Sequence, residues 1–243
     1  RPPRSTLFPY TTLFRSMKVI ETKNLHKTYN TTQVPVKAVN GIDLEIEKGE
    51  FTAVVGPSGC GKTTLMNLIG GLDEPTEGQV SINGQMLNGL KPGQLIDFRL
   101  HNIGFVFQAY NLLPVLTVKE NIEFIMQLQG RSHDECNTRV DELLQATGLT
   151  DKKNLRPNQL SGGQQQRVAV ARALASKPQF ILADEPTANL DSKATQELLE
   201  LMEKLNREEN MTFIFSTHDE RVMRKARRII TLDDGKIIAD VKI

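Results

Sequence analysis

Two segments near the beginning of the chain alternate apolar and polar residues, which is the pattern of strands with one buried face. They cover residues 19–25 and 42–46. Shorter runs at Phe51–Val55 and 180–183 are apolar almost throughout, as expected for strands buried on both faces. Strands that alternate with helices predict an α/β fold, with a parallel sheet covered on both faces. Further predicted elements are a helix at Lys62–Ile69, a helix with Leu198, Met202 and Leu205 on one face, a strand at 212–215, and a closing hairpin around Asp233, Asp234 and Gly235.

The middle of the chain, about residues 92–160, has a different pattern and is mostly helical. Ser132 and Glu135 have the spacing of a capping box, and the apolar residues Val140 and Leu144 follow at helical spacing. We therefore expect a helical subdomain inserted into the α/β core at these positions.

Composition limits the class of protein. Of the 243 residues, 39% are hydrophobic and 24% are charged, which is enough apolar material for a folded core. The net charge of +1 gives no sign of bulk attraction to nucleic acid, and we expect no nucleic-acid partner. Cys60 and Cys136 form no CxxC pair, so a reducing cytoplasm is the natural interpretation. No apolar run approaches ~18 residues, so no membrane span is predicted.

The first 16 residues differ in composition from the rest, with three arginines and no acidic residue. A transit peptide has a similar composition, but two prolines near the start and the lack of an amphipathic period argue against it. Residues 6–16 resemble the in-frame translation of a sequencing adaptor. We therefore expect residues 1–16 to be a non-native tail and residues 17–243 to form the native domain, whose net charge is then −2.

A glycine-rich segment between the strand Phe51–Val55 and the helix Lys62–Ile69 matches the phosphate-loop pattern G-x4-G-K-S/T. Glycines let backbone N–H groups converge on a phosphate, and the following helix adds its dipole. We expect Lys62 to bridge the β- and γ-phosphates of ATP and the Thr63 hydroxyl to bind Mg²⁺. The alternative, a chance match in a chain of this length, has a probability of roughly one in a hundred. The predicted ATP-binding residues here are Gly56, Pro57, Ser58, Gly59, Cys60, Gly61, Lys62, Thr63 and Thr64.

Two acidic residues follow the apolar run at 180–183. Asp184 ends the predicted strand, where a carboxylate can hold Mg²⁺, often through water. Glu185 projects one step further, towards the γ-phosphate and an attacking water, and can act as a general base. An ordinary acidic turn, helped by Pro186, is the alternative. Because the pair follows a buried strand in a chain with a phosphate loop, we favour a hydrolytic site.

The segment LSGGQQQR, residues 160–167, resembles the signature sequence of ATP-binding-cassette ATPases. Taken by itself it is also a capping box that begins a helix at 165–175, and a helix N-terminus with paired glycines is an anion site. The resemblance implies that this segment faces the γ-phosphate of an ATP held by the opposite subunit, and therefore a dimer of two copies with ATP between them. The residues implied to act in trans are Ser161, Gly162, Gly163 and Gln164, together with Asp191 of the segment ANLD.

Other positions resemble family elements in the same order along the chain. Tyr29 resembles the aromatic residue that stacks on adenine. Gln108, after the predicted strand Ile103–Phe107, resembles the glutamine that senses Mg²⁺ and water and couples to the partner. His218, after the strand Thr212–Ser216, resembles the switch histidine that touches the γ-phosphate. The remaining histidines, His26, His101 and His133, are interpreted as surface residues.

The resemblance covers the chain from Met17 onward and implies a P-loop NTPase (RecA-like) core with an antiparallel β subdomain and an inserted helical subdomain. Finer features, GLDEPTEG at 71–78, FVFQAYNLLP at 105–114 and PTANLD at 186–191, are similar to ATPases of the lipoprotein-releasing and macrolide-export branch. This branch implies a cytoplasmic ATPase, peripheral at the inner face of the membrane, that powers a separate integral permease. We expect the permease contact near residues 108–114 and the helical subdomain, through Leu112 and Leu113, which we expect to be exposed.

Two other functional classes are less consistent with the sequence. Nucleic-acid machines of the same superfamily insert long coiled coils or zinc modules, or carry two cassettes. Here Gly56 and Asp184 are 128 positions apart, with neither feature between them. A binding module without turnover would not need Glu185 and His218, and both are present.

Overall fold

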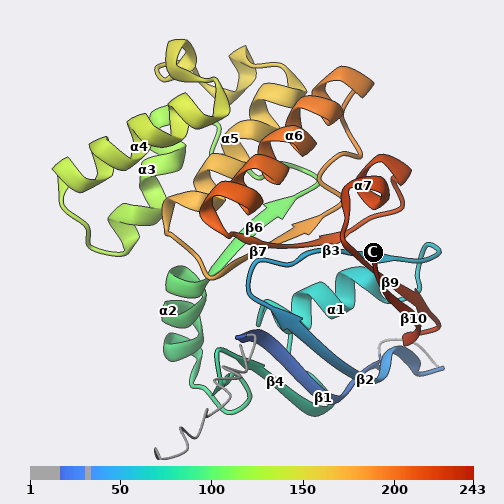
Figure 1. The fold of residues 1–243 in the computed structure, drawn as a ribbon. Helices are drawn as coiled ribbons and strands as arrows, with labels where there is room; N and C mark the ends of the chain where they lie inside the picture. The colour runs from blue at the N-terminus through green and yellow to red at the C-terminus, as the bar shows by residue number, and fades with distance from the viewer. Residues whose placement is uncertain (1–16, 31–33) are drawn as a thin grey trace, which may run out of the picture.

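The computed structural model describes residues 17–30 and 34–243, and the expected tail lies outside them. Within these residues the strands form two sheets (Figure 1). The larger has six strands in the order β10-β9-β3-β8-β7-β6, and the smaller has four antiparallel strands in the order β2-β1-β4-β5. The strands are β1 Lys18–Tyr29, β2 Val36–Glu47, β3 Phe51–Val55, β4 Glu77–Ile82, β5 Gln85–Met86, β6 Ile103–Phe107, β7 Phe180–Asp184, β8 Thr212–Ser216, β9 Arg228–Asp233 and β10 Lys236–Lys242.

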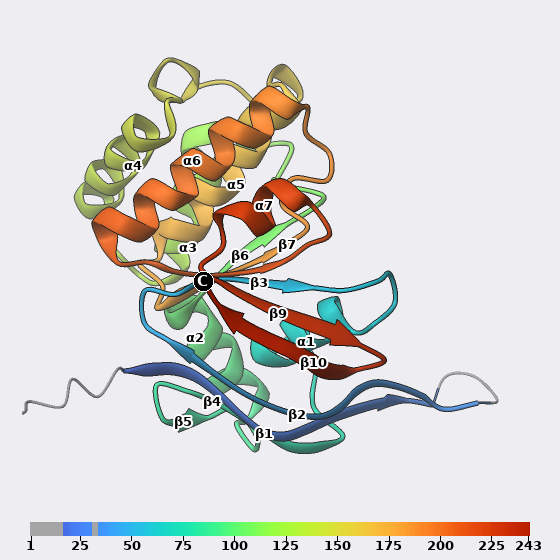
Figure 2. The ribbon, with the colours of Figure 1, turned by 45° about the vertical axis from the view of Figure 1, so that its right-hand side comes forward.

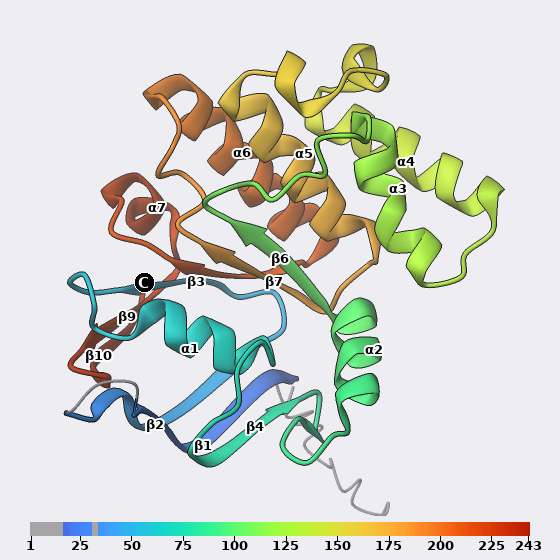
Figure 3. The same ribbon diagram turned by 180° about the vertical axis from the view of Figure 1, so that it is seen from behind.

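Helices cover both faces of the six-stranded sheet. On one face lie α5 and α6, with α3 and α4 beside α5 (Figures 1 and 3). On the other face α1 lies between the six-stranded sheet and the four-stranded sheet (Figure 2). The helices are α1 Lys62–Ile69, α2 Pro92–Asn102, α3 Val118–Leu128, α4 His133–Thr147, α5 Gly162–Ala175, α6 Ser192–Glu209 and α7 Glu220–Lys225, with 3-10 turns at Thr150–Lys152 and Pro157–Gln159. Among these helices, all within the described ranges, none has the length and apolarity needed to cross a membrane.

The core consists mainly of two buried clusters, one on each face of the six-stranded sheet. Neighbouring residues of a strand point to opposite faces. In β8, Phe213 and Phe215 join the cluster of α3 to α6, whereas Ile214 joins the cluster around α1. Because both faces of β3, β7 and β8 are buried, their sequences are apolar almost without a break, and the strands predicted there are confirmed.

The antiparallel strands extend beyond the segments predicted for them. β1 and β2 pair from Lys18 with Glu47 to Tyr29 with Val36. Their ends are held by backbone hydrogen bonds rather than by burial, so the side chains there show no alternation. Residues 92–160 also include β6, the strand predicted before Gln108, which pairs with β7 in the larger sheet. The boundaries of an inserted helical subdomain therefore stay a prediction.

Candidate nucleotide site

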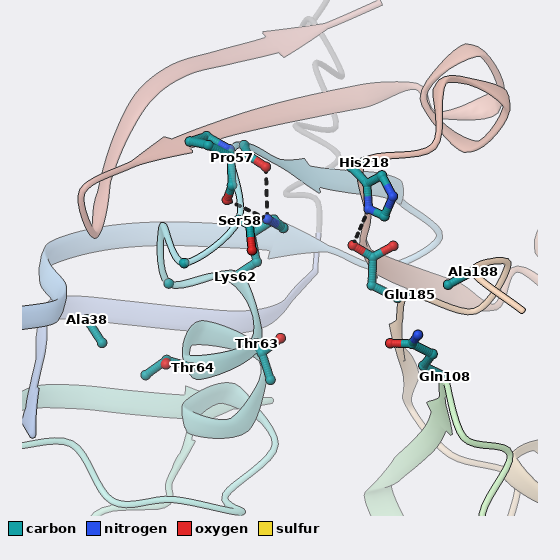
Figure 4. Close-up of a pocket in the computed structure, with 13 residues that line it drawn as sticks. Ala38, Pro57, Ser58, Lys62, Thr63, Thr64, Gln108, Glu185, Ala188 and His218 are labelled. Carbon is teal, nitrogen blue, oxygen red and sulfur yellow. Dashed lines mark hydrogen bonds and ion pairs between the residues drawn. The ribbon is translucent and has the colours of Figure 1, made fainter. Parts of the chain in front are cut away.

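Four parallel strands, β3, β8, β7 and β6, end at one edge of the larger sheet, and the segments that follow them enclose a pocket of about 540 Å³. The loop after β3 forms one side, and Gln108, Glu185 and His218 face it from the ends of β6, β7 and β8 (Figure 4). Residues predicted from separate parts of the sequence therefore meet in one cavity. Its lining residues are Ala38, Gly56, Pro57, Ser58, Gly59, Gly61, Lys62, Thr63, Thr64, Gln108, Glu185, Ala188 and His218.

The loop between β3 and α1 needs glycine at two positions. Gly56 and Gly61 have φ values of 150° and 104°, and Gly61 caps the N-terminus of α1. A Cβ on Gly56 would lie 2.1 Å from the carbonyl oxygen of Leu232, and one on Gly61 would lie 2.1 Å from that of Ala38. Only glycine therefore fits, and the loop wraps tightly at a helix N-terminus, where backbone N–H groups favour an anion.

Lys62 adds a cation to the same loop. Its side chain is largely buried, and Nζ donates hydrogen bonds to the carbonyl oxygens of Gly56 (2.8 Å) and Pro57 (2.9 Å). An ammonium group with neutral partners beside a helix N-terminus is well suited to a phosphate. The residues present thus fit the phosphate groups of a nucleotide.

Oxygen atoms suited to a divalent cation converge next to the loop. The Thr63 hydroxyl donates to the Asp184 carboxylate, at 3.1 Å and 3.2 Å from its two oxygens. Across residues 17–30 and 34–243, no group of three or more His, Cys, Asp or Glu residues is arranged to hold a metal. The Thr63 hydroxyl and the Asp184 carboxylate are a small set of oxygen ligands. Such a set suits Mg²⁺, which usually keeps several waters and takes other ligands from the substrate phosphates.

Glu185 has a strained backbone and a side chain fixed by His218. Its φ of 47° is left-handed, a strained conformation for a residue with a Cβ, and its N–H donates to the Ser216 carbonyl oxygen at 2.9 Å. One carboxylate oxygen lies 2.8 Å from Nδ1 of His218, and the other is buried with no hydrogen-bond partner in the described structure. A buried carboxylate oxygen without a partner is costly, which indicates that this side chain is held in place for a role other than stability.

A hydrogen bond between two side chains joins the segments that carry Glu185 and His218. Asp219 follows His218 and accepts a hydrogen bond from the Thr187 hydroxyl at 2.9 Å. Arg221 also donates to this carboxylate, and these hydrogen bonds hold the pKa of Asp219 below its ordinary value. Thr187 and Asp219 thereby connect the segment after Glu185 to the segment after β8. Their spacing of 32 positions leaves no local sequence signal.

Two of the predicted ATP-binding residues lie outside the pocket lining. Tyr29 donates its hydroxyl proton to Asp73 (2.7 Å), and its ring lies 5.0 Å from the Lys27 ammonium. Burial and the Asp73 contact raise the pKa of the Tyr29 hydroxyl. Cys60 is buried beneath the loop, with its sulfur 3.9 Å from Lys62 Nζ. The adenine contact predicted for Tyr29 therefore stays a prediction.

The signature segment also lies apart from the pocket of its own chain. Ser161 caps α5 through the predicted capping box with Gln164, and Asp191 caps α6 by accepting from the Ala194 N–H at 2.8 Å. The two helix starts are adjacent, because a Cβ on Gly163 would lie 2.7 Å from that of Ala194. None of the residues predicted to act in trans lines the described pocket, and Ser161 and Asp191 are exposed.

A strand, a phosphate loop and a helix in a parallel sheet, with a carboxylate at the end of a nearby strand, define a P-loop nucleotide-hydrolysing protein. The family model for ABC transporters matches residues 39–188, and the chain belongs to this family. It is therefore an ATP-binding-cassette ATPase, as the signature segment predicted.

Individual relatives agree with this assignment. The ATP-binding protein MJ0796 of Methanocaldococcus jannaschii is 46% identical over 93% of this chain and 97% of its own length. The lipoprotein-releasing system ATP-binding protein LolD 1 of Rhodopseudomonas palustris is 45% identical over 90% of this chain and 98% of its own length. The macrolide export ATP-binding/permease protein MacB of Hyphomonas neptunium is 46% identical over 91% of this chain, which spans only 34% of that protein.

A solved structure supports the fold. A dimeric post-hydrolysis state of MJ0796 bound to ADP and Pi matches with a TM-score of 0.85 and 44% identity, covering 92% of this chain and 98% of that one. The predicted α/β P-loop fold and the resemblance to lipoprotein-releasing and macrolide-export ATPases are confirmed.

Proposed function

We propose that this chain hydrolyses Mg-ATP between two copies of itself and thereby powers a separate membrane permease. The observation that carries the proposal is the division of the site. The phosphate loop, Gln108, Glu185 and His218 meet in one pocket, whereas the exposed Ser161 and its neighbours lie elsewhere on the same chain. A second copy could bring its signature segment to this pocket, and the solved relative MJ0796 is itself described as dimeric.

In this proposal Lys62 and the loop amides hold the phosphates. Thr63, Asp184 and Gln108 would hold Mg²⁺, and the bound ion would neutralise phosphate charge. The carboxylate of Glu185 accepts the proton of the attacking water. His218, hydrogen-bonded to one of its oxygens, fixes the carboxylate and reaches the γ-phosphate.

A second, apolar groove, which reaches Phe107 next to Gln108, is consistent with a membrane partner. It has a volume of about 590 Å³, lies between α2, β6, α3 and α5, and is lined mainly by apolar residues. Among them Ile96 is 56% exposed and Leu128 is 57% exposed. An apolar groove of this kind suits a short amphipathic helix of a permease. The relatives LolD and MacB carry names that indicate membrane export systems, and we infer that this chain lies at the cytoplasmic face beneath such a partner.

The two leucines expected to contact the permease differ in exposure. Leu112 is half-buried and packs against the inner cluster, so it has little surface to offer. Leu113 is 39% exposed and remains available. The groove residues, rather than Leu112, are therefore the main candidates for permease binding.

Replacing the carboxylate of Glu185 tests hydrolysis and dimerisation together. Glu185→Gln keeps the size of the side chain but removes the base, so kcat should fall by about 10²–10⁴-fold. Mg-ATP should then hold two subunits together, because ligand that binds the dimer more tightly than the monomer favours association. Size-exclusion chromatography with and without Mg-ATP measures this. Turnover at the parent rate would remove Glu185 from the catalytic residues.

Ser161 distinguishes a contact in trans from a simple helix cap. In the Glu185→Gln background, Ser161→Phe should abolish the ATP-dependent dimer without weakening nucleotide binding by the monomer. Ser132→Phe is the matched control, because Ser132 forms the same capping box on α4. A dimer that survives Ser161→Phe, or that is lost equally with Ser132→Phe, would contradict the proposed interface.

A further inference from the structure

The loop that follows Gln108 has a strained backbone. Tyr110 and Asn111 have φ values of 58° and 50°, in the left-handed region that residues with a Cβ rarely adopt. Asparagine tolerates this region, but tyrosine does so poorly. Two such residues in succession persist only where surrounding contacts impose the conformation.

Arg172 on α5 supplies those contacts. Its Nη2 donates to the carbonyl oxygen of Tyr110 at 2.9 Å, and its Nη1 donates to that of Asn111. Within residues 17–30 and 34–243 Arg172 forms no ion pair with a carboxylate, and burial lowers the pKa of its guanidinium. Burying a cation costs free energy unless an ion pair or hydrogen bonds compensate for the lost water. Here those hydrogen bonds go to the two strained residues.

The position of Arg172 is fixed relative to β6, the strand that ends just before Gln108. Helix α5 packs so closely on β6 that a Cβ on Gly104 would lie 2.8 Å from the carbonyl oxygen of Ala173, the neighbour of Arg172. This contact leaves α5 no room to move towards the strand. Arg172 therefore holds the loop from a rigid base.

Two further contacts attach the loop to the signature helix and to the segment after Glu185. The Tyr110 hydroxyl lies against the start of α5, where a Cβ on Gly162 would be 2.9 Å from it. The Asn189 side chain donates to the carbonyl oxygen of Gln108 at 3.0 Å. The loop is thus attached at Gln108 and at Tyr110, the first of the two strained residues.

Arg172 also lines the apolar groove described above, together with Phe107. We propose that Arg172 is a positioning residue for ATP hydrolysis: it holds Tyr110 and Asn111 left-handed and so sets the place of Gln108 in the pocket. Because Arg172 also lines the groove, a partner seated there acts on Gln108 through Arg172. The proposal rests on the hydrolytic role proposed for Gln108.

Hydrogen exchange in the nucleotide-free protein tests the contact directly. In Arg172→Met, amides of residues 108–117 should exchange about tenfold faster, because the strained loop opens once its carbonyls are released. Arg172→Lys keeps the charge but loses the two-pronged geometry, and should be intermediate. Arg139→Met is the matched control, since Arg139 donates to the carbonyl oxygen of Leu174 (3.3 Å), at the end of α5 rather than to the loop. Unchanged exchange at 108–117 in Arg172→Met would overturn the proposal.

Steady-state kinetics then separates positioning from general damage. Arg172→Met should lower kcat by about ten- to 100-fold while KM for ATP stays within about twofold, because the phosphate loop is untouched. In a Gln108→Ala background the same substitution should lower kcat by less than about twofold further, since the two act through one group. An additive loss would place the effect of Arg172 elsewhere. If Gln108→Ala itself keeps parental kcat, the role proposed for Gln108 fails, and faster loop exchange in Arg172→Met would still show the contact.

Discussion

Asn121 offers a sharp test of how the segment after Gln108 is attached to the helical layer. It lies on α3 with 0% of its surface exposed, yet its amide is fully used. Oδ1 accepts from the Leu113 N–H at 2.8 Å. Nδ2 donates to the carbonyl oxygens of Leu113, Leu116 and Thr117 at 3.1, 3.1 and 2.9 Å. One side chain thus contacts the backbone at both ends of the turn 113–117.

The loss of stability expected in Asn121→Ala can be estimated from these hydrogen bonds. Asn121→Ala removes the donor of three carbonyl groups and the acceptor of one N–H, from a side chain that is itself fully buried. A net hydrogen bond is worth about 1 kcal/mol, and a buried group left unpaired costs about 1–3 kcal/mol. One NH₂ group has only two hydrogens to share among the three carbonyl groups, so we count two donated hydrogen bonds and one accepted. At about 1 kcal/mol each, their loss should lower the free energy of unfolding by about 3 kcal/mol. At an m-value of about 2 kcal/mol/M, the urea midpoint should fall by about 1.5 M.

Urea unfolding of the parent and two variants measures this. Asn137→Ala is the matched control, because Asn137 is half-buried on α4 and accepts one hydrogen bond, from Lys119 at 2.6 Å. Its cost should stay within about 1 kcal/mol. If Asn121→Ala is no more destabilising than Asn137→Ala, the amide is not the anchor of the segment and the reasoning is refuted.

Three further outcomes are expected. Lys62→Ala should remove ATP affinity and turnover together, and near-normal binding by calorimetric titration would contradict the phosphate role. Ile96→Asp, in the apolar groove, should abolish pull-down of the permease. Val115→Asp, which is exposed outside that groove, should leave the pull-down unchanged. Equal binding by both variants would place the contact elsewhere. The hydrogen bond from Arg228 lowers the pKa of Asp240, so its stabilising contribution is present above the ordinary value of 3.8 and is lost as pH falls through the lower folded value. The drop in urea midpoint from neutral pH to pH ~3 should therefore be smaller in Asp240→Asn than in the parent, and an equal drop would show that this pair does not contribute.

The parts of the candidate site that are recognisable in the sequence are those with local causes. The phosphate loop is recognisable because Gly56 and Gly61 leave no room for a side chain and because a buried strand and a helix flank them. Asp184 and Glu185 are recognisable because they end an apolar strand. The roles predicted for these residues remain to be tested, but their positions follow from patterns a few residues long.

Contacts across the chain could not be predicted in this way. Ala38 closes over the phosphate loop through its carbonyl group, which any residue would supply. Leu112 was expected to be exposed, but its neighbours in the fold half-bury it. Asp219 and Arg172 act on segments 32 and about 60 positions away, and nothing in the intervening sequence marks them.

By itself, the sequence determined the family, the buried strands and the list of candidate residues for binding phosphate and activating water. Those properties depend on neighbours in sequence, because periodicity, glycine turns and helix caps are local. Only the tertiary structure decided that Gln108, Glu185 and His218 meet, since this requires β6, β7 and β8 to lie side by side in parallel. It also decided that Ser161 lies outside that pocket and that Arg172 holds the loop beside it. Such arrangements arise from strand order and helix packing, which depend on pairing between segments distant along the chain.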